Sequence, residues 1–167
     1  MGCIRILLSP FGFLFGAVAM MTVAVAGFAI AVAAMGAPAC YRDDSWVAND
    51  AFAAILLGIG FVGAIVGGAV ARKTSGVPAV LLLVAFAAVI HLVPHLDSPL
   101  DASKSQRFAG RPESRPDEAP FSELVQWTEH PGWMRYAGAL AAVTGVVFGS
   151  SLAQGGRKPA RASRGEE

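Results

Sequence analysis

The chain has 167 residues, of which 54% are hydrophobic and 15% are charged, and its mean hydropathy is +0.55. A soluble globular domain carries about 25% charged residues, so this composition excludes an ordinary soluble protein and predicts side chains that face lipid. The 13 basic and 12 acidic residues nearly cancel, which excludes the strong positive field on which a nucleic-acid-binding protein depends.

Four long apolar runs predict transmembrane helices. They cover about residues 10–35, 51–71, 78–94 and 136–152, and a helix needs about 17–25 such residues to cross a bilayer. A link of five residues, 72–76, joins the second and third runs, so these two are expected to pair as an antiparallel hairpin. We therefore expect an all-α integral membrane protein in which residues 1–154 form one domain and four transmembrane helices make an antiparallel bundle.

The longest polar segment, residues 97–135, follows the third run. Its first part, 98–119, contains three prolines and is expected to be extended and poorly ordered. Its second part, 120–129, predicts a short amphipathic helix lying on the membrane surface. The apolar arc of that helix comprises Phe121, Leu124, Val125, Trp127 and Thr128.

Arginine and lysine are unequally divided between the segments that flank the runs. Residues 1–6, 72–76 and 153–167 hold seven of the 13 bases, whereas 36–50 and 97–135 hold six bases and ten of the 12 acids. The positive-inside rule then places both termini in the cytoplasm and the loop 97–135 outside. We expect a plasma (inner) membrane protein, from a bacterium with a GC-rich genome, whose residues 155–167 form a disordered basic cytoplasmic tail.

Glycines four residues apart recur in three of the runs. In lipid, helices associate through close packing, and small residues permit the backbones to approach. The spacing leaves open whether these faces pack within the chain, against partner membrane proteins or in a homo-oligomer. The pairs are Gly12 and Gly16, Gly63 and Gly67, and Gly145 and Gly149.

Aromatic residues lie near the ends of the runs, where tryptophan and tyrosine are typical of the boundary between lipid and water. The sequence therefore predicts four membrane-interface anchors: Trp46, Trp127, Trp133 and Tyr136.

His91 is the only ionisable side chain well inside an apolar run, and His95 follows four residues later. This spacing suits two ligands of one transition-metal ion, with His130 as a further candidate. Pro94 lies between the first two and removes a helical hydrogen bond. Two other interpretations stay open: His91 donates to a neighbouring helix in a structural role, or it contacts a redox cofactor such as haem or a quinone.

Enzyme chemistry has little support in the sequence. The four runs contain no Asp, Glu, Lys or Arg, and Cys-x-x-Cys and the common hydrolase motifs are absent. We expect a non-enzymatic accessory or scaffold subunit that requires no cofactor, lies in the lipid bilayer and packs into a larger complex through its Gly/Ala-rich faces. The alternatives are a metal- or redox-cofactor-binding protein using His91 and His95, and a channel or carrier for a small neutral solute.

Overall fold

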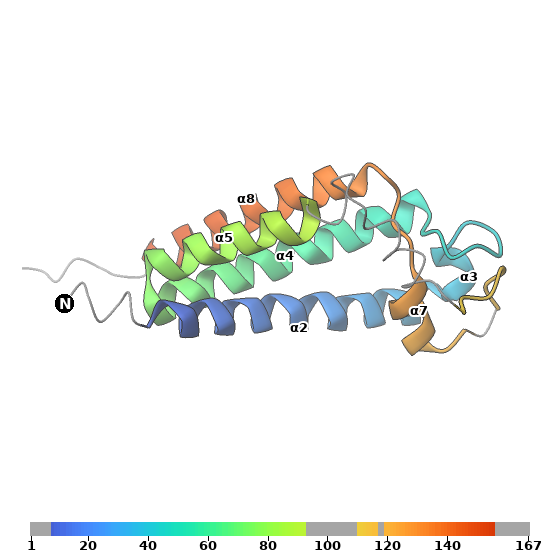
Figure 1. The fold of residues 1–167 in the computed structure, drawn as a ribbon, viewed down its shortest axis with the longest axis horizontal. Coiled ribbons are helices and arrows are strands. Elements are labelled where there is room, and N and C mark those ends of the chain that lie inside the picture. Colours follow the sequence, from blue (N-terminus) through green and yellow to red (C-terminus); the bar gives the residue numbers. More distant parts are fainter. Residues whose placement is uncertain (1–7, 93–109, 117–118, 156–167) are drawn as a thin grey trace, which may run out of the picture.

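The computed structural model describes residues 8–92, 110–116 and 119–155 (Figure 1). Helices contain 79% of these residues, and none of them forms a β-strand. His95, the last residues of the third predicted span, the loop residues 97–109 and the tail 156–167 lie outside the described residues.

Four long helices run along the molecule: α2 (Ser9–Met35), α4 (Asp50–Ser75), α5 (Val77–Leu92) and α8 (Met134–Gly155). Two short helices, α3 (Ala37–Cys40) and α7 (Phe121–Trp127), lie near one end (Figure 1). The helices α2, α4 and α8 are each long and apolar enough to cross a membrane. The described part of α5 has 16 residues, or about 24 Å, which is shorter than a hydrocarbon core of about 30 Å.

Local chemistry sets where these helices begin and end. The side chain of Asn49 accepts a hydrogen bond from the backbone N–H of Phe52 at 2.8 Å and so caps the start of α4. Gly36 ends α2 at φ 77° and Gly76 ends α4 at φ 81°, a left-handed region that glycine enters without steric cost.

One face of α4 packs against α2, and the two helices run in opposite directions. Gly12 lies beside Ser75, while further along α2 Gly16 lies beside Gly67. A Cβ added at Gly16 would lie 2.8 Å from the carbonyl oxygen of Gly67. The absence of side chains at this crossing therefore lets the two backbones touch.

A second face of α4 packs against α8, and these two helices run in the same direction (Figure 1). Gly145 lies beside Ala64, and Gly149 lies beside Ile65. This contact is far more extensive than the one between α4 and its hairpin partner α5. Small residues on two faces of α4 thus bring it against α2, which is antiparallel to it, and against α8, which is parallel to it. The expected antiparallel bundle of four spans stays a prediction.

Two hydrophobic clusters stabilise the fold. The first lies between the long helices and is built from small and aliphatic residues, including Ala64, Leu83 and Val146. The second lies in the region we call the head, residues 37–49, 110–116 and 119–133, where it contacts the ends of α2 and α4. Large apolar side chains such as Phe15 and Leu140 are exposed on the outer faces of the helices, as lipid contact requires.

Candidate functional site

His91 lies on α5 at its contact with α8. Its Nδ1 is 2.8 Å from the backbone oxygen of Ala87, and because a carbonyl can only accept, the proton of this bond resides on Nδ1. The ring packs over Gly138, where an added Cβ would lie 2.8 Å from Cδ2 of the imidazole. The geometry therefore gives His91 a packing role between two helices.

The three histidines proposed as metal ligands do not form a cluster among the described residues. His130 is exposed in the segment that leads into α8, and His95 lies outside the residues that the structure describes. Within residues 8–92, 110–116 and 119–155, no group of three or more His, Cys, Asp or Glu side chains is arranged to hold a metal ion.

All six predicted packing glycines lie at contacts within the chain. Gly12, Gly16, Gly63 and Gly67 form the crossing of α2 with α4, and Gly145 and Gly149 lie against α4. An added Cβ at Gly149 would collide with the backbone oxygen of Ile65. A partner helix that packs on this protein must therefore use a different surface.

An apolar groove lies between α2 and α4 on the side of the helices nearer the head. It has a volume of about 540 Å³ and almost no polar lining. Gly58 is one of its lining residues; it is exposed and has open space where its Cβ would be. The glycine spacing in the sequence does not predict this groove, because Gly58 has no glycine four residues away. The lining residues are Val23, Ala26, Gly27, Ile30, Ile55, Gly58, Ile59 and Val62.

Arg115 fastens residues 110–116, which we call the strap, onto the rest of the head. It is only 3% exposed. Its backbone N–H donates to the oxygen of Asp44 at 2.5 Å, and its guanidinium lies 5.2 Å from the ring centre of Tyr41. Two guanidinium nitrogens donate to backbone oxygens, while the buried Nε has no partner among the described residues. Among the described residues, the Arg115 side chain is therefore held by two backbone oxygens and by the ring of Tyr41.

Cys40 and Tyr41 lie close to Arg115 of the strap. Burial raises the pKa of the Cys40 thiol, and the nearby Arg115 charge opposes this more weakly. Burial also raises the pKa of Tyr41, against a smaller lowering by its hydrogen bond to Thr128 at 2.6 Å. Both groups are therefore protonated at neutral pH, and the thiol is a poor nucleophile.

The predicted membrane-interface anchors occupy different environments. Trp46 is 3% exposed, donates to the oxygen of Pro112 at 3.1 Å and packs edge-on against Trp127. It belongs to the core of the head and leaves almost no surface for lipid. Trp46 is buried because the segments around Trp46 and Glu129, which are far apart in the sequence, pair with each other. The backbone N–H of Glu129 donates to the backbone oxygen of Trp46 at 2.9 Å.

Trp133 and Tyr136, by contrast, are exposed at the start of α8. The Nε1 of Trp133 donates to a carboxylate oxygen of Asp50 at 3.1 Å. This bond ties the entry of α8 to the first turn of α4, so both aromatic rings lie at the end of the helices that carries the head.

No protein-family model matches the chain, and no curated protein or solved structure matches it significantly. Its function is therefore inferred from its own residues and their geometry.

Proposed function

We propose that this protein is a four-span integral membrane protein that acts as a non-enzymatic accessory or scaffold subunit of a larger membrane assembly. Three of the spans are α2, α4 and α8, and the fourth is the run 78–94, to which α5 belongs. Both termini are cytoplasmic and the head is extracytoplasmic. The charge distribution supports this orientation, because Arg72 and Lys73 lie in the last turn of α4, away from the head.

The groove between α2 and α4 is the observation on which the scaffold role rests. It extends over eight residues of each helix, from Val23 to Ile30 and from Ile55 to Val62, which is a rise of about 10 Å between the first and the last of them. Packed helices lie about 8–10 Å apart between their axes. Because it is apolar and contains the small residues Ala26 and Gly58, it suits a transmembrane helix of another membrane protein.

A pair of matched substitutions on α4 tests this role. Gly58 lies in the groove and Gly60 does not, yet a Cβ at either position would meet no atom within 4 Å. Both substitutions to leucine raise helix propensity by about 1 kcal/mol. Gly58→Leu fills the groove and is expected to release the protein from its assembly, whereas Gly60→Leu leaves the assembly intact.

The measurement is the apparent mass of the full-length protein after gentle solubilisation from native membranes, with the co-purifying proteins identified. A wild-type protein that migrates alone contradicts the scaffold role. An assembly that survives Gly58→Leu shows that a different surface makes the contact. A copy of the same chain as the only partner identifies a homo-oligomer, and this too is abolished by Gly58→Leu if the groove is the contact.

A further inference from the structure

The short helix α7 lies beside α2 and not beyond its end (Figure 1). The ring centres of Phe121 on α7 and Phe28 on α2 are 5.7 Å apart. Phe28 precedes the last residue of α2, Met35, by seven positions, or about 10 Å along the helix axis. A residue of the head therefore reaches about two turns back along a helix that is apolar enough to span a membrane.

The two sides of α7 have different surroundings. Leu124 points inward and is buried in the core of the head. Thr128, which follows the helix, donates to the backbone oxygen of Leu124 and accepts from the Tyr41 hydroxyl. Phe121 and Val125, four residues apart on one face, are 43% and 50% exposed. The apolar arc expected from the sequence is thus divided between the protein core and the outer surface.

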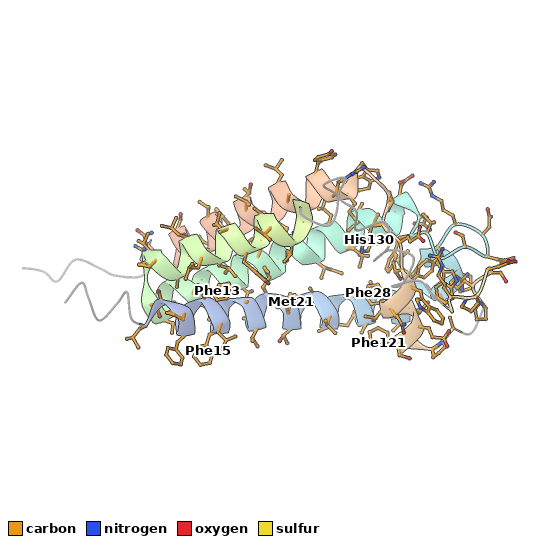
Figure 2. All side chains as sticks on the ribbon, viewed as in Figure 1. Phe13, Phe15, Met21, Phe28, Phe121 and His130 are labelled. Carbon is orange, nitrogen blue, oxygen red and sulfur yellow. The ribbon has the colours of Figure 1, made fainter. Side chains whose placement is uncertain are left out.

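The outward residues continue the exposed apolar surface of α2. Figure 2 shows Phe121 on the same side of α2 as Phe15. Val25, three residues before Phe28 and therefore its neighbour on the helix surface, is 51% exposed. One apolar surface therefore extends from the middle of α2 onto α7. The medium that surrounds this part of α2, whether lipid or water, also contacts α7.

The length of α2 sets the depth of this surface. Its 27 residues span about 40 Å, so about 10 Å of it exceeds a hydrocarbon core of about 30 Å. If that excess is divided between the two ends, Phe28 lies about 5 Å inside the acyl boundary on the side of the head. Interfacial helices bury their apolar faces to a depth of about 5–10 Å.

We propose that α7 is embedded in the boundary between acyl chains and headgroups of the leaflet nearer the head, through Phe121 and Val125. The partner of this surface is phospholipid, and the embedded helix holds the head against the membrane. The proposal rests on the membrane-spanning arrangement proposed above but is independent of the scaffold role and of the groove between α2 and α4.

Spin-label depth measurements on the full-length protein in phospholipid vesicles test it. Single cysteines replace Val125, Val18 and Ser114 in a Cys3→Ser background that retains the buried Cys40, with the background protein as the blank. Val18 is exposed on α2 and Ser114 is exposed on the strap. Each nitroxide is scored by its collisions with oxygen, which concentrates in lipid, relative to a water-soluble nickel chelate.

We expect the oxygen-to-nickel ratio at Val125 to be several-fold above that at Ser114 and below that at Val18. A ratio at Val125 equal to that at Ser114 overturns the proposal while leaving the spans intact. If Val18 also resembles Ser114, α2 does not lie in lipid, and the membrane-spanning arrangement fails together with this inference.

Discussion

Gly149 and Gly58 show that the effect of a missing side chain depends on what lies beside it. At Gly149 an added Cβ would collide with the carbonyl oxygen of Ile65, which belongs to the backbone of α4 and cannot rotate away. At Gly58 the same atom would enter open space. Gly149 is therefore required by helix contact, whereas the fold itself leaves space for a side chain at Gly58.

This difference predicts opposite effects of the same substitution. Alanine improves helix propensity by about 1 kcal/mol at either position. At Gly149 a cost of about 1–3 kcal/mol from overpacking outweighs or cancels that gain, because α4 and α8 must separate. Thermal unfolding in mild detergent should give a lower Tm for Gly149→Ala than for Gly58→Ala. Equal Tm values would contradict the close contact of α4 with α8.

The glycine pattern in the sequence identified only part of this contact. Gly145 and Gly149 were found because they are four residues apart. Gly68 was not, although a Cβ there would collide with the backbone oxygen of Val146. The spacing of glycines along one helix indicates a face with small residues. Whether another helix packs on that face depends on distant parts of the chain.

At the scale of elements, the strap lies against the part of the head that contains the buried Cys40, because Arg115 is close to the Cys40 thiol and to the ring of Tyr41. The Arg115 side chain supplies two hydrogen bonds and a contact with the ring of Tyr41. Hydrogen bonds to charged groups contribute about 1.5–3 kcal/mol each when they are retained in a folded structure. Loss of Arg115 should therefore allow the strap to open far more often.

Arg115→Ala is expected to raise the rate at which a thiol reagent modifies Cys40 by about tenfold or more, since every 1.4 kcal/mol of opening free energy is a factor of ten. Mass spectrometry of the native protein in detergent measures that rate. Arg42→Ala is the control, because Arg42 forms an exposed ion pair with Asp50 whose loss costs at most about 1 kcal/mol. An equal rate in the two variants would show that Arg115 does not hold the strap.

The head was the part of the fold that the sequence predicted least well. The helix at 120–129 was expected, and α7 is found at Phe121–Trp127. The strap was expected to be part of a poorly ordered segment, yet Arg115 is buried and Trp46 donates to Pro112 across 66 residues. Such pairings between distant loops leave no periodic pattern in the sequence, so only the structure shows them.

At the scale of the whole molecule, α4 is the central helix, with α2 on one face and α8 on the other. The sequence placed the ends of these helices within a few residues, because apolar runs, Gly36, Gly76 and the cap at Asn49 act locally. The parallel contact of α4 with α8 could not be predicted, since it joins residues about 80 positions apart. A run of apolar residues predicts that a helix can lie in lipid, but it does not predict which other helix packs against it.

The proposed orientation of the molecule is based on the position of the head at one end of α4 and of the basic residues Arg72 and Lys73 at the other. If α4 crosses the membrane, the strap and the turn after α4 face different compartments. Ser114 in the strap and Thr74 near the end of α4 are both exposed, which makes them suitable reporters of the two sides.

Labelling of single cysteines at these two positions tests the membrane-spanning arrangement most directly. In a Cys3→Ser background, Ser114→Cys and Thr74→Cys are each treated in intact cells with a maleimide that cannot cross membranes, with the buried Cys40 alone as the blank. The arrangement predicts that position 114 reacts in intact cells and that position 74 reacts only after permeabilisation. Reaction of both positions in intact cells, or of neither before permeabilisation, would contradict it.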